Sequence, residues 1–453
     1  MDENPTSLRV TDPGIRDLFT LDSRWQAWLD VEAALALAEA ELGMVPEDAA
    51  AEIVKKCKLE LFNRENVIEG LARTAHPLVP LVWELSRICD GDAGNYVHWG
   101  ATTQNITQTG NLLVLRQAHE IFLKQIARVL IAMADLADRG ADMVLPGRTH
   151  GQHAVPATFG YKVAVWIDEM VRHVERMRQI EPRIFTVLLG GAAGTLASFN
   201  GKGYAVQDGV AKRLGMTAMQ MPSRVIGDHQ AEYVCLLGLI AATNGKIARE
   251  IYTQMKQEFG EVEEPVPPGT VGSSTMPQKR NPKLSQDIAA SAMQIRVLVP
   301  QALESMQTEH EADRATSITM NHALAESSGH MGDILSRMAM MLEGLTLNPE
   351  RMRKNLDLTD GMIMAETLML TLGETIGRQE AHDVIYDAAQ AAATGTKTFT
   401  ELLEADPQVK MHMNAAQIRE LLDPTAYTGD CAAMAHAQAT RARDVAAAIN
   451  AAG

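Results

Sequence analysis

Long stretches in which apolar residues recur every three or four positions dominate the middle of the chain. Five of them cover residues 112–137, 159–180, 231–259, 285–308 and 322–345. This spacing places the apolar side chains on one face of an α-helix. At a rise of about 1.5 Å per residue, such helices are about 33–44 Å long, which indicates a long helical bundle. We expect a kink or break at Pro300, because proline lacks the N–H that a helix interior requires.

Shorter helices are predicted on both sides of these five. Residues 25–42 form an Ala- and Leu-rich amphipathic pattern with acidic residues on the opposite face, and Gly43 followed by Pro46 ends it. Residues 350–453 return to short helical patterns. We therefore predict an all-α fold in three parts, which are an N-terminal helical domain (1–110), a central domain of five long helices (111–350) and a C-terminal helical domain (351–453).

Two of the long helices carry segments that are apolar on more than one face. These are residues 234–242 (VCLLGLIAA) and 338–345 (MAMMLEGL). Such segments must be buried on several sides, which a single five-helix bundle does not fully provide. We therefore expect subunits to associate through these helices.

Glycine-rich and polar segments interrupt the helical pattern and are predicted as loops. The richest in anion-binding groups is residues 269–282, GTVGSSTMPQKRNP, and the prolines just before it rule out a continuous helix. We predict a mobile loop between two helices, with a solvated basic linker as the alternative. Residues 91–110 and 146–156 are two further predicted loops. Residues 188–195 hold three glycines but no GxGxxG after a strand, so we do not predict dinucleotide binding.

The composition of the chain limits the kinds of molecule that we expect it to bind. Its 453 residues are 46% hydrophobic with a formal net charge of −16, which disfavours binding to nucleic acid or to an anionic membrane. An anionic substrate would need a local positive site such as residues 269–282. The four cysteines match neither a zinc spacing nor a disulfide framework, and no signal segment or apolar run of about 18 residues occurs, so we predict a cytoplasmic protein. His150 and His153 have metal-ligand spacing, but no third ligand is evident, and we predict no metal.

Four motifs resemble the aspartase/fumarase superfamily of lyases. Residues 272–282, GSSTMPQKRNP, closely match its signature loop. Residues 147–154 (GRTHGQHA), 98–105 (HWGATTQN) and 190–199 (GGAAGTLASF) are similar to its other motif regions. The resemblance covers nearly the whole chain. The branches that the motifs resemble most are adenylosuccinate lyase and bacterial 3-carboxy-cis,cis-muconate cycloisomerase.

The resemblance implies a homotetramer with a central bundle of twenty helices, five from each subunit. Each active site would collect three motif regions from three subunits and bind a small dicarboxylate, with no cofactor. The family removes a proton next to a carboxylate and expels a group from the neighbouring carbon, typically releasing fumarate. The carbanion is held as an aci-carboxylate, which needs dense, preorganised hydrogen-bond donors.

The resemblance also implies roles for residues in the motifs. Ser273 would be the general base, with its alkoxide stabilised by backbone N–H groups of the loop and by Lys279. Lys279 and Asn281 would hold the carboxylate that accumulates charge. Thr149 would add a hydroxyl group, and His150 would act as the acid or orient the leaving group.

A second group of residues is predicted to bind substrate: Thr102, Thr103, Gln104, Ser274, Met276, His98, His76 and Arg314. His98 and His76 would equally suit hydrogen-bonded structural roles. Thr107, Gln108 and Thr109 are expected to be helix-cap and surface residues instead.

Three departures from the related lyases leave the substrate open. A glutamate that charges the catalytic histidine in those lyases is replaced by Gln286, and an amide holds the ring without stabilising imidazolium by charge. Ala312 and Asn321 fall where adenylosuccinate lyases carry phosphate-binding arginines, although Arg314 could compensate. Bacterial carboxymuconate cycloisomerases tend to carry Trp in place of His150.

Three functions therefore remain as hypotheses. The first is a lyase that eliminates an amine or similar group from a succinyl-type substrate. The second is a cycloisomerase of the 3-carboxymuconate type, which Gln286 and the missing phosphate arginines favour. The third is a non-catalytic structural relative, of the kind found among lens crystallins, and the intact Ser273, Lys279 and Asn281 argue against it.

Overall fold

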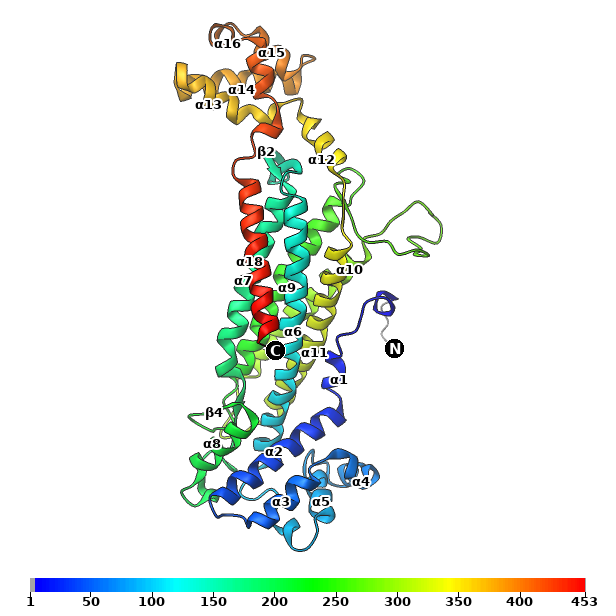
Figure 1. The fold of residues 1–453 in the computed structure, drawn as a ribbon, viewed down its shortest axis with the longest axis vertical. Coiled ribbons are helices and arrows are strands. Elements are labelled where there is room, and N and C mark those ends of the chain that lie inside the picture. Colours follow the sequence, from blue (N-terminus) through cyan, green and yellow to red (C-terminus); the bar gives the residue numbers. More distant parts are fainter. Residues whose placement is uncertain (1–4, 453) are drawn as a thin grey trace. The chain divides into compact units, whose positions relative to one another are not determined.

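The computed structural model describes residues 5–452 and confirms the all-α class, with helices forming nearly all of the regular structure. All five predicted long helices are present (Figure 1), and their bounds are α6 (Thr103–Arg139), α7 (Phe159–Ile184), α9 (Asp228–Gln254), α10 (Lys283–Glu304) and α11 (Arg314–Glu343). The expected break at Pro300 does not occur, because α10 continues to Glu304. The buried residues Ile295 and Ala302 on either side pack against their surroundings and offset the one hydrogen bond that the proline removes.

The chain divides into two compact units, and each long helix contributes a segment to both. Unit 1 contains residues 5–123, 173–242 and 290–336, and unit 2 contains residues 124–172, 243–289 and 337–452. Each unit is made of three separate segments, whereas the predicted domains are three consecutive stretches of the sequence. The three-domain division stays a prediction.

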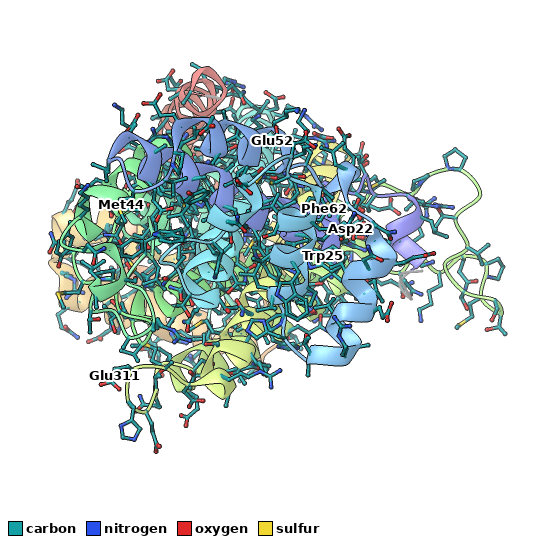
Figure 2. The ribbon with its side chains drawn as sticks, turned by 90° about the horizontal axis from the view of Figure 1, so that it is seen from below. Asp22, Trp25, Met44, Glu52, Phe62 and Glu311 are labelled. Atoms are coloured by element: carbon teal, nitrogen blue, oxygen red, sulfur yellow. The ribbon has the colours of Figure 1, made fainter. Side chains whose placement is uncertain are left out.

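Unit 1 begins with short helices packed around α2 (Leu21–Glu41). Thr20 caps this helix by accepting a hydrogen bond from Ser23 N, and Trp25 on it is fully buried (Figure 2). The expected placement of the acidic residues away from the core is only partly right, because Glu32 and Glu39 are both buried. The other regular elements of this unit outside the long helices are η1 (Pro5–Leu8), α1 (Ile15–Leu18), α3 (Glu47–Lys56), η2 (Leu59–Leu61), α4 (Arg64–Thr74), α5 (Val79–Ile88), η3 (Ala93–Tyr96), β3 (Thr186–Val187), η4 (Ala197–Phe199), α8 (Gly203–Leu214) and β4 (Thr217–Ala218).

Unit 2 combines two antiparallel strand pairs with the C-terminal helices. Strands β1 (Val144–Thr149) and β2 (Gln152–Thr158) form a hairpin, and β5 (Val262–Glu263) pairs with β6 (Thr346–Leu347). Capping boxes at Thr398 and Asn414 start two of the short helices. The remaining elements are α12 (Pro349–Leu356), η5 (Asp357–Thr359), η6 (Met362–Met364), α13 (Ala365–Ile376), α14 (Arg378–Thr394), α15 (Phe399–Ala405), α16 (Pro407–His412), α17 (Ala415–Leu421), η7 (Pro424–Ala426) and α18 (Cys431–Ala451).

A helix that crosses a bilayer must be both long and continuously apolar. Across residues 5–452, none has a window apolar enough to cross a membrane.

Candidate active site

The motif GRTHGQHA forms the tip of the β1–β2 hairpin, so the prediction of an irregular loop at residues 146–156 is wrong. His150 (φ 52°) and Gly151 (φ 78°) both have positive φ, as the two central residues of a type I′ turn require. Thr149 pairs with Gln152 directly below the turn. The sequence contains a signal for this turn that the loop prediction overlooked, namely a His-Gly pair between residues that favour an extended backbone. It leaves Thr149 and His150 exposed at the tip.

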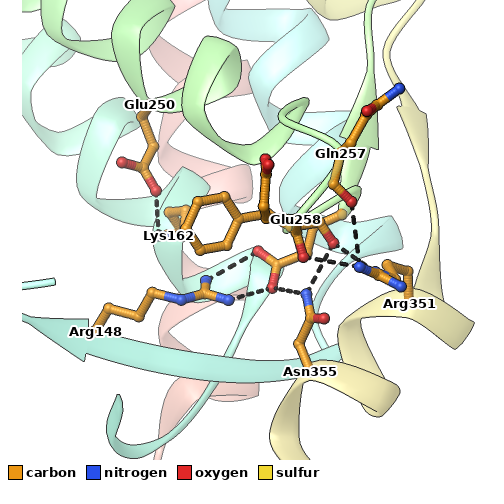
Figure 3. Close-up of polar contacts among 9 residues, drawn as sticks. Arg148, Lys162, Glu250, Gln257, Glu258, Arg351 and Asn355 are labelled. Carbon is orange, nitrogen blue, oxygen red and sulfur yellow. Dashed lines mark hydrogen bonds and ion pairs between the residues drawn. The ribbon is translucent and has the colours of Figure 1, made fainter. Parts of the chain in front are cut away.

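An ionic network around the buried Glu261 holds the hairpin close to its turn in unit 2 (Figure 3). Arg148 donates two hydrogen bonds, of 2.6 and 3.0 Å, to the carboxylate of Glu261, which is fully buried. Asn355 on α12 donates a third, of 2.8 Å, and Arg351 donates to the carbonyl oxygen of Phe259. Glu261 lies just before β5 and the signature loop, so one network anchors the chain next to His150 and the chain that leads to Ser273.

The signature loop leads from β5 into α10 and is closed at its neck by side chains (Figure 1, green). It follows a short strand rather than a helix, which corrects the prediction of a loop between two helices. Glu264 accepts hydrogen bonds from Leu284 N (3.0 Å) and Ser285 N (2.7 Å), and so joins the two ends of the loop. Across the neck, Asn281 Nδ2 donates to Gly272 O at 2.6 Å. A side chain at Gly272 would clash, because a Cβ there would lie 1.8 Å from the carbonyl oxygen of Lys279.

Ser273 sits at the start of the loop's inner turn, and its side-chain oxygen faces two backbone donors. Thr275 N and Met276 N donate to Ser273 Oγ at 3.3 and 3.2 Å. Backbone N–H groups aimed at a hydroxyl oxygen stabilise its anionic form. These donors are the groups that a serine needs in order to act as a base.

The other predicted residues of unit 2 point to solvent. Ser274, Met276, Lys279 and Gln286 are exposed. Within residues 5–452, the Lys279 ammonium has no hydrogen bond or ion pair. Thr149, His150 and Gln286 likewise make no side-chain hydrogen bond to any described residue.

In unit 1, the predicted polar loop at residues 91–110 is only half correct. Residues 103–110 are the first turns of α6. Asn105 Oδ1 accepts hydrogen bonds from Thr102 N and Gly191 N, both at 3.1 Å. The first bond caps the start of α6, and the second gives a backbone N–H of the glycine-rich segment a hydrogen-bond acceptor. Thr109 is buried and its hydroxyl oxygen accepts from Leu188 N, so its expected surface position is wrong.

The structure brings His76 and Thr103 together. His76 Nδ1 accepts hydrogen bonds from Leu78 N (3.3 Å) and Val79 N (3.1 Å), so the ring carries its proton on Nε2. This nitrogen lies 3.2 Å from Thr103 Oγ1 and donates to it. Burial, and then the charge of His98, lower the pKa of His76, in agreement with a neutral ring.

His98 is held by a carboxylate that the sequence did not single out. His98 adopts φ 61°, and its Nδ1 lies 2.6 Å from Glu32 Oε1 on α2. Burial acts to lower the pKa of His98, but the charge of Glu32 and the hydrogen bond to it prevail, so the pKa is raised. The pairing orients the imidazole ring and favours its protonated form.

The side-chain amide of Gln104 is not free to bind a ligand, because it is hydrogen-bonded to Arg224. Arg224 Nε donates to Gln104 Oε1 at 3.0 Å, and Gln104 Nε2 donates to Arg224 O at 2.9 Å. Arg224 was not among the predicted site residues, since no motif contains it. Arg314, the first residue of α11, is exposed, as is Asn321.

Comparisons with known proteins agree with these motifs. A family model described as lyase matches residues 7–297, and one described as adenylosuccinate lyase C-terminus matches residues 361–437. The chain is 36% identical to the N-acetyl-S-(2-succino)cysteine lyase of Dickeya dadantii, over 92% of each chain. It is also 36% identical to the 3-carboxy-cis,cis-muconate cycloisomerase of Pseudomonas aeruginosa, again over 92% of each chain.

A solved structure gives the same result. The crystal structure of a fumarate lyase from Mesorhizobium sp. BNC1 superposes with a TM-score of 0.89 at 35% identity, covering 95% of this chain and 98% of that chain. The chain therefore belongs to the aspartase/fumarase superfamily, whose members here include lyases and cycloisomerases.

Proposed function

We propose that the protein is a lyase that eliminates a group from a succinyl-type compound, such as an N-substituted aspartate, and releases fumarate. The observation that supports this most is the position of Ser273, whose Oγ faces two backbone N–H groups, while the Lys279 ammonium has no partner among the described residues. The two form a base and a cation on one loop, which is what abstraction of a proton next to a carboxylate requires.

The proposed reaction has two steps. Ser273, as the alkoxide, takes a proton from the carbon next to a carboxylate, and the electron pair moves into that carboxylate. Lys279 and Asn281 hold the resulting aci-carboxylate, while Thr102 and Thr103 grip the second carboxylate. The electron pair then forms the double bond as the bond to the leaving group breaks, and His150 protonates the departing atom.

The first test measures fumarate by ultraviolet absorbance from adenylosuccinate, N-substituted aspartates, N-acetyl-S-(2-succino)cysteine and malate. Ser273→Ala should abolish the activity found, whereas Gln278→Ala, an exposed change in the same loop, should keep it. Full activity in Ser273→Ala would refute the assignment of the base. A protein that releases no fumarate from any of these compounds would refute the proposed elimination.

Two observations favour particular variants of this reaction. Gln286 in place of a glutamate, together with the similarity to a cycloisomerase, favours ring closure of 3-carboxymuconate as the second candidate. Loss of the muconate absorbance without fumarate would select it. Similarity to an enzyme named for N-acetyl-S-(2-succino)cysteine makes carbon–sulfur cleavage a variant of the first candidate.

We further propose a cytoplasmic homotetramer that shares its active sites. The long helices carry exposed apolar side chains, including Val297 (73% exposed) and Leu239 (53% exposed), that a partner subunit would cover. His150 and Ser273 would then come from different subunits. Mixing the inactive variants His150→Ala and Ser273→Ala should restore activity as subunits exchange, and no recovery in a mixed tetramer would contradict shared sites.

A further inference from the structure

A four-residue segment of unit 2, residues 261–264, contacts both of the chain segments that carry predicted catalytic groups. Its sequence, EVEE, places carboxylates at Glu261, Glu263 and Glu264. Glu261 accepts two hydrogen bonds from Arg148 in the β1–β2 hairpin. Glu263 and Glu264 accept hydrogen bonds from the signature loop and from the start of α10. The proposed reaction gives this segment no role, although it joins two parts of the machinery.

On the hairpin side, the contact of Glu261 fixes both distance and orientation. Two N–H groups of Arg148 lie 2.6 and 3.0 Å from the two carboxylate oxygens, and such bidentate pairs are strong and directional. The guanidinium also lies 4.9 Å from the centre of the Phe259 ring. Arg148 pairs with His153 across the two strands, so its position sets that of the turn between them. The turn is therefore held through Glu261, which is fully buried.

Glu261 is itself fixed by contacts of its backbone and its side chain. Its N–H group donates to Gln254 O at 2.9 Å, and its carbonyl oxygen accepts from Asn348 N at 3.0 Å. Asn355 on α12 donates to the carboxylate at 2.8 Å and to Phe259 O at 2.9 Å. Support of this kind from surrounding groups is what keeps a site in its productive geometry. Glu261 is therefore a rigid point against which the hairpin is positioned.

On the loop side, the next residues of the same segment hold the signature loop. Glu263 Oε1 accepts from Arg280 at 2.6 Å, and Arg280 stands between the two loop residues proposed to hold the aci-carboxylate. Glu264 accepts from two backbone N–H groups at the start of α10. Val262 alone separates Glu263 from Glu261, and it lies in a strand paired with β6. A displacement of Glu261 is therefore carried along this strand to the loop contacts.

We propose that Glu261 is a positioning residue for two different active sites. The inference rests on the proposed function, in which His150 and Ser273 of one subunit serve separate sites of the tetramer. Glu261 then holds the hairpin of His150 for one site and, through residues 261–264, the loop of Ser273 for another. Loss of its charge should impair both sites, each in the step that its own group performs. Misplacement of a catalytic group by about 1 Å costs about a hundredfold in rate.

Hydrogen exchange of the assembled protein tests the two contacts without turnover. Glu261→Gln keeps the shape of the side chain but turns an NH₂ group toward a donor of Arg148, and it should speed amide exchange about tenfold in both residues 144–158 and residues 265–283. Arg148→Lys, which loses the bidentate contact, should affect only the hairpin. Glu343→Gln breaks a similar two-bond contact with an arginine of α6 at the surface and should affect neither. Faster exchange confined to the hairpin in Glu261→Gln would overturn the double role.

Subunit mixing assigns the two effects to separate sites. A mixture of His150→Ala and Ser273→Ala subunits builds working sites from the loop of the first variant and the hairpin of the second. With Glu261→Gln on the loop donor, fumarate release should fall about tenfold or more, with a larger isotope effect for substrate deuterated at the carbon that loses the proton. With Glu261→Gln on the hairpin donor, a similar fall should come with a shifted pH–rate profile and no larger isotope effect.

These two readouts separate positioning from a loss of folded protein, which would lower both rates without changing the isotope effect or the pH profile. If Glu261→Gln fails to assemble, Asn355→Ala removes one donor to the same carboxylate and should reproduce both effects at smaller size. Recovery in the parent mixture with a loss in only one of the two hybrids would overturn the inference and leave the proposed function intact. No recovery in the parent mixture would overturn the shared sites of the proposed function, and the two-site role with them.

Discussion

The buried carboxyl group of Glu39 should make the stability of this protein fall as the pH rises. Glu39 is fully buried on α2, and neither of its oxygens has a hydrogen-bond partner among the described residues. Burial, and then the charge of Glu32, raise its pKa from the ordinary value of 4.5 to about 8. The folded protein therefore keeps a proton on Glu39 over a pH range in which the unfolded chain has lost it.

The sign and size follow from that difference in pKa. Because the folded pKa is raised, the stabilising contribution is complete below pH 4.5 and is lost as the pH rises toward about 8. Each pKa unit corresponds to about 1.4 kcal/mol, so the loss by pH 7 is about 3 kcal/mol. Between pH 6 and pH 8 the free energy of unfolding should fall by about 2 kcal/mol because of this group alone.

Urea unfolding of the wild-type protein and of Glu39→Gln, at pH 6 and pH 8, measures this effect. Glutamine has the same shape but no titration, so the variant should lack the fall of about 2 kcal/mol, while all other titrations cancel. Glu41→Gln, an exposed change on the same helix, should retain it. Parallel pH dependence in wild type and Glu39→Gln would refute the reasoning, because Glu39 would then ionise as freely in the folded protein as in the unfolded chain.

Three further perturbations test the parts that position the site. Glu32→Gln should lower the pKa of His98, and an unchanged imidazole titration by NMR would contradict their pairing. Gly272→Ala should lower kcat/KM about a hundredfold with little change in Tm, because the added methyl group forces the neck of the signature loop apart. Gln278→Ala, an exposed change in the same loop, should lose far less. Glu264→Ala leaves two buried N–H groups of α10 without an acceptor and should cost about 1–3 kcal/mol locally, seen as faster proteolytic cleavage within residues 265–283. Unchanged cleavage would show that Glu264 does not secure the loop.

The long helices and the location of the signature loop could be predicted from local sequence patterns. Apolar periodicity over five long segments is a local property of the chain, and it predicts each long helix. The predicted ends differ from the observed ones by up to nine residues, at the start of α6. The signature motif likewise singled out Ser273 as the candidate base, because a motif is a local property of the chain, and that role stays a prediction. The turn at His150 and Gly151 could also have been predicted from its local sequence.

Which side chains contact one another could be learned only from the folded chain. Glu32 and Glu39 belong to an amphipathic pattern that gave no reason to place them inside, and they are buried because other segments of unit 1 cover that side of α2. The contacts of Arg148 with Glu261 and of Arg224 with Gln104 join residues more than a hundred positions apart. A hydrogen bond depends on the distance between two atoms in space, and a local pattern carries no information about a partner so far along the chain.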